Sequence, residues 1–418
     1  MASLRKPLLG RELPSAALGK GGNATPLSSA VSLLATALGT GVLTLPYVAS
    51  QSGPGQFLAV LAVMAYATDV SLILLIEVSR ATGLSSLGAI TGLLFGSVGS
   101  SSFQLMISSV LFLALTAMQR VVLDLLPMFL EELGDLPRAS LSPFAVSLVV
   151  NVFVCIACLS KSFHRLRFAS GAALACLLPF MASLARKALA AALDPATAAP
   201  RPTSESASLR GFCLAPPLLA SAFGCHFGLL DISAELQPQH RDSIYAVIHW
   251  ISLVLLPAAY VVVPLAGVSL FGADTAENIL QEFQGDRAME LARGVLSLTN
   301  ALRMPLIVMP LQVLLGDMLK TWSPAGGSKH KAGLLLVEAA GVPLLLISSL
   351  VAARQMHTLA RVLGVLGGTC GVLSCYCLPG MLYLALSRQG YPSSARFRWK
   401  AIAVIILGAS VMISACLS

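Results

Sequence analysis

Three ionisable side chains lie inside long apolar stretches of this chain. Asp69, His226 and Arg303 are surrounded by apolar and small residues in a sequence that is only 11% charged. A charge held in the middle of a bilayer costs about 3 kcal/mol on insertion scales, so such groups are candidates for handling ions or protons. Because histidine ordinarily titrates near physiological pH, His226 is a candidate proton sensor, and Asp69 is the best acid for relaying a proton. Structural alternatives remain open: His226 could simply be hydrogen-bonded in place, and Arg303 could form a buried ion pair with Asp69 or Asp231.

Other charged and sulfur-containing groups favour structural roles. Arg120 and Asp124 are spaced four residues apart in a helical stretch, which predicts a local ion pair near a helix end. Cys155 and Cys158 have the spacing of a metal or redox motif, but inside an apolar helix small packing residues are the better interpretation. We therefore predict no metal site and no cofactor.

Two glycine-containing motifs interrupt apolar stretches that are long enough to cross a bilayer. The first is Gly39-Thr40-Gly41, and the second contains Gly224 and Gly228 on either side of His226. Glycine weakens a helix, and freed backbone groups are tolerated in a membrane only where they line a cavity or meet a ligand. These motifs predict broken helices at a binding site. The alternative is a small-residue packing face of the kind that is common in membrane helices.

The elements that carry these motifs are membrane helices. The 418 residues are 56% hydrophobic, with a mean hydropathy of +0.83. Only 11% of them are charged, whereas soluble domains carry roughly 25% charged residues. The net charge of +8 is not arranged as a basic stripe with interleaved aromatics, so nucleic acid is not an expected partner. The sequence also lacks an HExxH, a GxSxG and a paired-aspartate motif, which argues against an enzyme.

Apolar length predicts an all-α polytopic membrane protein with 11 transmembrane helices. Basic residues are more numerous on the side of the N-terminus, which the positive-inside rule makes cytosolic. Residues 1–25 are expected to form a disordered cytosolic tail, followed by one transmembrane domain over 26–418. The predicted spans are 28–50, 56–77, 102–127, 142–160, 169–190, 212–234, 243–270, 289–314, 332–352, 358–386 and 400–417.

The two interrupted spans are the first and the sixth, so they occupy equivalent places in two sets of five. This arrangement predicts an inverted repeat, with repeat one over about 28–190, repeat two over about 212–386 and one extra C-terminal helix at 400–417. Exposed N–H groups at one helix end suit an anion, and unwound carbonyls suit a cation. A site with both kinds of backbone group suits a zwitterion, and hence an amino acid.

These residues also carry a family resemblance. GTGVLTLPYVASQSG in the first span, FGCHFGLLDISAEL followed by Arg241 in the sixth, and LTNALRMPLIVMPLQ in the eighth resemble the amino acid/auxin permease family. Within that family of the APC superfamily, the chain is similar to the system A and system N neutral amino acid transporters. The resemblance implies a LeuT-like 5+5 core and substrate contacts at Gly39, Thr40, Gly41, Phe223, Gly224 and Cys225.

Departures from the family pattern concern the coupling ion. The resembling transporters bind sodium with an asparagine in the first span and a hydroxyl residue in the eighth. In this chain the asparagine aligns with Ala35, beside Thr36, and the hydroxyl residue aligns near Ala301. Arg303 lies two residues beyond Ala301, and its fixed charge could replace that of the ion. We therefore expect a sodium-independent and proton-coupled protein, with ion coupling at Arg303, Asp69, His226 and Thr36.

The sequence predicts a secondary active transporter of neutral amino acids in the lipid bilayer, working by alternating access. A sodium-coupled symporter and an amino acid sensor of the same fold are the alternatives. Selectivity is expected to reside in a wall that includes the third span, for which Ser108, Ser109 and Phe112 are candidates. The membrane is either the plasma membrane or a vacuolar or lysosomal membrane.

Overall fold

The structure is a computed structural model, and it describes residues 23–137, 140–159, 167–193, 209–283, 285–322, 328–391 and 394–418. Within these ranges the chain is helical, apart from turns and one isolated bridge between Ala24 and Leu236. Most of the predicted N-terminal tail, residues 1–22, lies outside the described residues. Its last part is held in place, since Ala24 N–H donates to Glu235 O and Gln237 N–H donates to Ala24 O.

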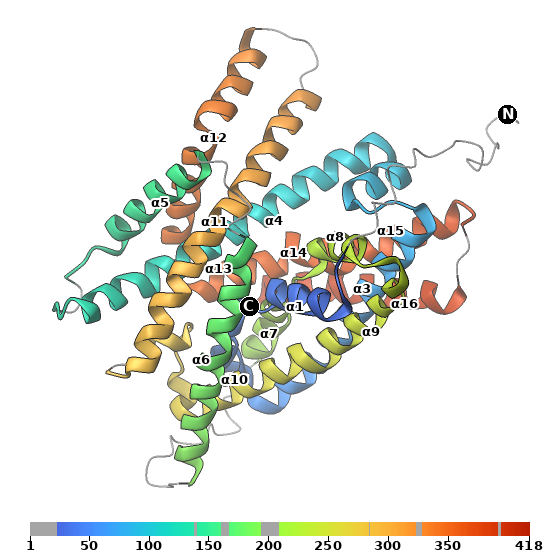
Figure 1. Cartoon of the computed structure of the whole chain (residues 1–418). Helices are drawn as coiled ribbons and strands as arrows, with labels where there is room; N and C mark the ends of the chain where they lie inside the picture. The colour runs from blue at the N-terminus through green and yellow to red at the C-terminus, as the bar shows by residue number, and fades with distance from the viewer. Residues whose placement is uncertain are drawn as a thin grey trace, which may run out of the picture.

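A helix or a series of helical segments covers most of each predicted span (Figure 1). In chain order these are α1 (Pro26–Ala37), η3 (Thr40–Leu43) and α2 (Leu45–Ser52); α3 (Pro54–Thr82); α4 (Leu87–Leu133); α5 (Pro143–Leu159); α6 (Arg167–Leu193); α7 (Leu209–Ala222) and α8 (His226–Glu235); α9 (Ser243–His249), η7 (Trp250–Leu255) and α10 (Leu256–Phe271); α11 (Arg287–Trp322); α12 (Ser328–Gln355); α13 (Leu359–Gly368), α14 (Cys370–Val372), η10 (Leu373–Cys377) and α15 (Leu378–Arg388); and α16 (Ala395–Leu417). Short helical turns η6 (Pro238–His240), η8 (Gly272–Asp274) and η9 (Ile279–Gln281) lie in the connections.

The described part of the chain is a helical polytopic membrane fold. Seven of its helices are long and apolar enough to cross a membrane, or eight if the bent pair of α12 and α13 counts as one span. Large apolar side chains point outward from the bundle, for example Val313 on α11 and Ile406 on α16. Such a surface is stable in lipid but not in water.

Helix α4 is longer than predicted. The sequence predicts a span over 102–127, whereas the helix begins at Leu87 and bends at Gly96. Gly96 has a φ of 71°, which lies in the left-handed region that only glycine adopts at little cost. The helix therefore enters the bundle at an angle that the apolar pattern did not reveal.

Helix α3 lies in the core, and 78% of its apolar window is buried. Apart from this core, a separate cluster of buried apolar side chains joins α4, α5, α11 and α12. Figure 1 shows these as a group of helices at one side of the bundle. Gln119 on α4 donates to Asn151 on α5 at 2.6 Å within this cluster. The predicted local pair of Arg120 and Asp124 is confirmed, with Nη2 2.5 Å from Oδ1. These polar bonds fix helix positions where hydrophobic packing alone gives little direction in lipid.

Glycines in α13 allow it to approach α7 closely. A Cβ added to Gly367 would lie 1.8 Å from Pro217 O, whereas a Cβ on Gly364, one turn earlier, would meet nothing within 4 Å. We predict that Gly367→Ala lowers the thermal unfolding temperature of the purified protein, because overpacking costs about 1–3 kcal/mol. Gly364→Ala is the matched control and should leave that temperature unchanged or raise it. Equal unfolding temperatures for the two variants would contradict the close contact.

Candidate functional site

The first and sixth spans are both broken, at the positions that their glycines predicted. Helix α1 ends at Ala37, and Gly39 has the non-helical angles φ −118° and ψ −147°. Helix α7 ends at Ala222, and α8 starts only at His226. The two breaks touch, since a Cβ added to Gly41 would lie 3.1 Å from the Ala222 Cα.

Tyr260 on α10 links the two breaks through one hydroxyl. Its Oη lies 2.7 Å from Ala222 O and 3.3 Å from Ala37 O, and its ring is completely buried. These carbonyls belong to the last residues of α7 and α1, so both lack the partner that a continuous helix provides, although Ala37 O also accepts from Gly39 N–H at 2.8 Å. The Phe223 ring packs edge-on against the Tyr260 ring, with a centroid distance of 5.1 Å. Nothing in the sequence pattern singled out Tyr260.

A cavity of about 250 Å³ lies beside the two breaks. The first-turn N–H groups of α8 have no partner within the helix, and Phe227 and Gly228 of that turn line the cavity. The remaining wall comes from α1 and η3, α4, α7, α11, α13 and η10. Its lining is mostly apolar, with Thr36, Thr40, Ser221, Asn300 and Arg303 as the polar and charged members.

The six predicted substrate contacts divide into two groups. Gly39, Thr40, Gly41 and Gly224 line the cavity. Phe223 and Cys225 are buried and do not belong to its lining. A role for any of the six in binding stays a prediction.

The cavity wall on α4 differs from the sequence-based guess. Ser108 donates to the sulfur of Met318, and Ser109 donates to Leu105 O in its own helix. Instead, Val110, Leu111 and Ala114 line the cavity. An apolar helix gives no signal in its sequence of which face meets a cavity, so the rotation of α4 could not be predicted.

Arg303 projects from α11 into the cavity. It also lines a smaller cavity between the end of α1, α6 and α11, together with Thr299 and Asn300. In the described part of the chain its guanidinium has no ion pair and no hydrogen bond. Beside it, the Asn300 Oδ1 is buried without a partner. Both groups are therefore available to a ligand.

Asp69 is not the partner of Arg303. The Asp69 Oδ1 lies 2.7 Å from His249 Nδ1 and accepts a 2.8 Å hydrogen bond from the Ser252 hydroxyl. This corrects the sequence-based alternative of a static Asp69–Arg303 pair. His249 was missed because it lies 180 positions away and has no recognisable motif around it.

Thr36 lies on α1 and His226 on α8, and these two helices pack against each other. Thr36 lines the cavity and donates to Ser32 O at 2.6 Å. His226 is 1% exposed, and its Nε2 lies 2.6 Å from the Ser71 Oγ. Its Nδ1 has no partner among the described residues. The ring is thus behind the cavity wall rather than in the cavity.

The chemistry of this arrangement is binding rather than bond cleavage. The residues that the structure describes contain no group of three His, Cys, Asp or Glu that could hold a metal ion. Helix-end N–H groups and a guanidinium can receive a carboxylate. A polytopic helical fold with broken helices around such a cavity defines a membrane transporter class.

Comparison with known proteins identifies the family. Residues 22–418 match the transmembrane amino acid transporter proteins, and the chain belongs to this family, whose members are transporters rather than enzymes. Amino acid transporter AVT6A of Arabidopsis thaliana is 25% identical over 321 residues, covering 71% of this chain and 68% of that protein. Sodium-coupled neutral amino acid transporter 4 of Mus musculus is 23% identical over 177 residues, covering 41% of this chain and 31% of that protein.

Solved structures share the fold. The structure of MhsT in complex with L-phenylalanine has a TM-score of 0.52 at 13% identity, covering 96% of this chain and 100% of that chain. A manganese transporter of Eremococcus coleocola has a TM-score of 0.54 at 11% identity, covering 96% of this chain and 89% of that chain. Both neighbours have the LeuT-like helical fold. At such low identity they establish the fold alone.

Removing the Tyr260 hydroxyl should destabilise the break after α7. In Tyr260→Phe the Ala222 carbonyl stays buried without a partner, which costs about 1–3 kcal/mol. We expect a lower thermal unfolding temperature than for Tyr66→Phe, a control on α3 whose side chain is exposed. If both variants unfold at the wild-type temperature, the hydroxyl does not hold the breaks together.

Filling the cavity should abolish ligand binding without unfolding the protein. Ala114→Phe places a ring in the cavity, whereas Ala409→Phe places the same ring on the exposed face of α16. We expect binding of labelled amino acids to purified protein to fall at least about tenfold, equivalent to 1.4 kcal/mol, only for Ala114→Phe. Unchanged binding with intact folding would place the ligand elsewhere.

Proposed function

We propose that this protein is a secondary active transporter that moves neutral amino acids across a membrane by alternating access. Family membership supports the amino acid as cargo, and the cavity beside the two broken helices supports a site for it. The observation that carries the proposal is the unpaired Arg303 guanidinium, which lines the same cavity as the first turn of α8. This combination is a receptor for a carboxylate, and the apolar remainder of the wall suits an uncharged side chain.

The complete architecture that we propose has eleven spans in two inverted repeats, with α16 as the extra helix and the N-terminus in the cytosol. In support, the breaks fall in the first and sixth spans, α1 packs on α8, and α2 packs on α7. Each half of one broken helix thus lies against the opposite half of the other. The membrane is the plasma membrane or a vacuolar or lysosomal membrane.

Transport is proposed to be independent of sodium. Ala35 is 5% exposed and offers no side-chain oxygen, although sodium requires several oxygen ligands. The smaller cavity between α1, α6 and α11 contains the Arg303 charge. A second cation 4 Å from a guanidinium is repelled by about 4 kcal/mol at an effective dielectric constant near 20. Arg303 thereby occupies the electrostatic role that a bound cation has beside a substrate carboxylate.

The test is uptake of a mixture of labelled neutral amino acids into proteoliposomes with either a proton or a sodium gradient. We expect accumulation with the proton gradient and no additional stimulation by sodium. Saturable stimulation by sodium would contradict the coupling proposal. Saturable binding without any flux would instead favour a sensor of the same fold.

Arg303 should control affinity for the carboxylate. Loss of a charge-assisted hydrogen bond costs about 1.5–3 kcal/mol, so Arg303→Met should weaken amino acid binding by about tenfold or more. Arg303→Lys should retain part of the affinity because it keeps the charge. Arg361→Met, at an exposed position of α13, is the matched control. Wild-type affinity in Arg303→Met would exclude the guanidinium as the carboxylate partner.

A further inference from the structure

Polar pairs join α3 and α9 along one line. Arg80 Nη2 lies 2.9 Å from Asp242 Oδ1, the Tyr245 hydroxyl donates to Glu77 at 2.5 Å, and His249 Nδ1 lies 2.7 Å from Asp69. Positions 242, 245, 249 and 252, which run from the N-cap of α9 through α9 into the π-helical turn η7, share one helix face. On α3, positions 69, 77 and 80 also share one helix face. The partners follow in reverse order along the chain, because 80 pairs with 242, 77 with 245 and 69 with 249. We call this line the α3–α9 seam.

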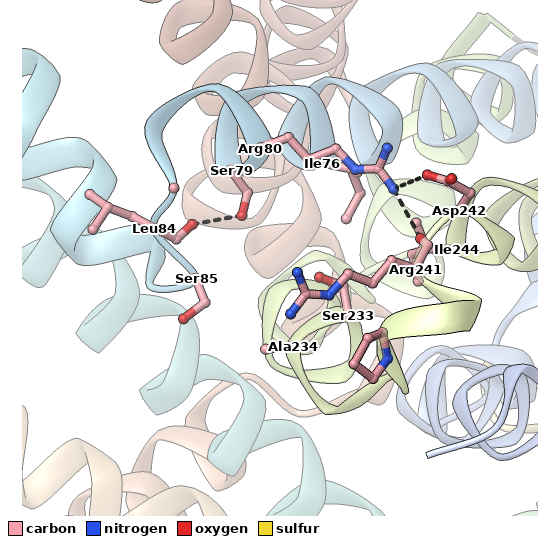
Figure 2. Close-up of a pocket in the computed structure, with 12 residues that line it drawn as sticks. Ile76, Ser79, Arg80, Leu84, Ser85, Ser233, Ala234, Arg241, Asp242 and Ile244 are labelled. Carbon is pink, nitrogen blue, oxygen red and sulfur yellow. Dashed lines mark hydrogen bonds and ion pairs between the residues drawn. The ribbon is translucent and has the colours of Figure 1, made fainter. Parts of the chain in front are cut away.

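The seam opens into a cavity of about 490 Å³ at the end of α3 (Figure 2). Figure 2 shows Arg80 reaching toward Asp242 and the Arg241 carbonyl, while the Arg241 side chain extends into the cavity. The Asp242 side chain is 93% exposed, so this end of the seam is in contact with solvent. Arg80 also lies over the Tyr245 ring, 4.7 Å from its centroid, which connects the cavity to the next pair.

The inner end of the seam is a buried carboxylate. Asp69 is eleven residues from Arg80 along α3, or about 16 Å at 1.5 Å per residue. Its side chain is 5% exposed, whereas the His249 side chain is half exposed. A simple packing contact does not need a carboxylate at this depth. The π-helical turn that follows His249 places Ser252 as a second donor to Asp69, and such turns are frequent at functional sites.

We propose that the α3–α9 seam is a proton pathway and that the Asp69–His249 pair binds the coupled proton. Neutral His249 donates its Nδ1–H to the Asp69 carboxylate, which gives the pair a charge of −1. One proton from water then forms a bond to Nε2, no other bond breaks, and the resulting imidazolium–carboxylate pair is neutral. The loaded pair therefore carries no net charge. This inference rests on the proposed transport function and assigns the residues that would couple it to protons.

The elements that pack against α3, α9 and η7 bring other titratable groups. Helix α1 and η7 carry no ionisable side chain. Of the inner elements, α8 brings His226, Asp231 and Glu235, α10 brings Tyr260, and η10 brings Tyr376 between two cysteines. The other helices on α3 carry Tyr47 on α2; Arg120, Asp124, Glu131 and Glu132 on α4; Arg210 and Cys213 on α7; Tyr383 and Arg388 on α15; and Arg396, Arg398, Lys400 and Cys416 on α16. In the described ranges, none of these bonds to Asp69 or His249.

Helix α3 also connects the pair to the substrate cavity. Ser71 bonds to His226, the first residue of α8, and Thr68 lies 2.9 Å from the Tyr376 hydroxyl of η10. Gly228 of α8 and Cys375 of η10 line the cavity. A shift of α3 on proton binding is thus transmitted to two parts of the cavity wall through direct hydrogen bonds.

The experiment uses the full chain in proteoliposomes with labelled neutral amino acids. It compares exchange without a gradient, accumulation driven by a proton gradient, and proton entry reported by an internal pH dye. Asp69→Asn and His249→Gln should keep exchange but lose gradient-driven accumulation and proton entry. Tyr245→Phe, which removes only a hydroxyl of the pathway, should slow accumulation. His357→Gln, in the α12–α13 connection, is the control and should behave as wild type.

Accumulation at the wild-type level in Asp69→Asn or His249→Gln would overturn the inference. Absence of exchange in the wild-type protein would instead overturn the proposed transport function. A second measurement needs no transport: the pH dependence of tryptophan fluorescence, since Trp250 directly follows His249. We expect a transition in the wild type that is absent in His249→Gln and shifted in Asp69→Asn. An identical transition in His249→Gln would also overturn the inference.

Discussion

The cavity depends on how the fold satisfies broken backbone in a low-dielectric surrounding. Each interrupted helix leaves carbonyl and N–H groups that lipid cannot pair. The Tyr260 hydroxyl reaches the terminal carbonyls of both α1 and α7, and the contact of Gly41 with Ala222 keeps the two breaks together. The first-turn N–H groups of α8 have no partner within the helix, and Phe227 and Gly228 of that turn line the cavity. The Tyr260 hydroxyl thereby provides a partner at the break after α7, where the Ala222 carbonyl is 2.7 Å away, and lies beside the break after α1, where Gly39 N–H donates to Ala37 O.

Charge is distributed over two separate places. Arg303 provides an unpaired guanidinium in the cavity, and Asp69 provides a carboxyl group that lies outside the cavity lining and is bonded to His249 and Ser252. Their separation matters because a static Arg303–Asp69 pair would neutralise both groups. In the function that we propose, Arg303 receives a carboxylate and Asp69 a proton, and α3 connects the two places through the hydrogen bonds of Thr68 and Ser71.

Much of this arrangement could be predicted from local sequence. Apolar length located the helical stretches, glycines located both breaks, and four-residue spacing identified the Arg120–Asp124 pair. Contacts between distant segments could not be predicted, because they depend on helix rotation and packing. Tyr260, His249 and the cavity-facing side of α4 are of this kind. Phe223 and Cys225 lie in the predicted motif, yet the turn after α7 directs them into the core rather than to the cavity.

The most direct test of the central claim is the position of an amino acid bound to the purified protein, determined by cryo-electron microscopy in sodium-free buffer. The account predicts ligand density in the cavity between the two breaks, with the carboxylate close to the Arg303 guanidinium and the first turn of α8. Density at any other place, or a cation bound between α1 and α11 in sodium-containing buffer with Arg303 turned away, would contradict it.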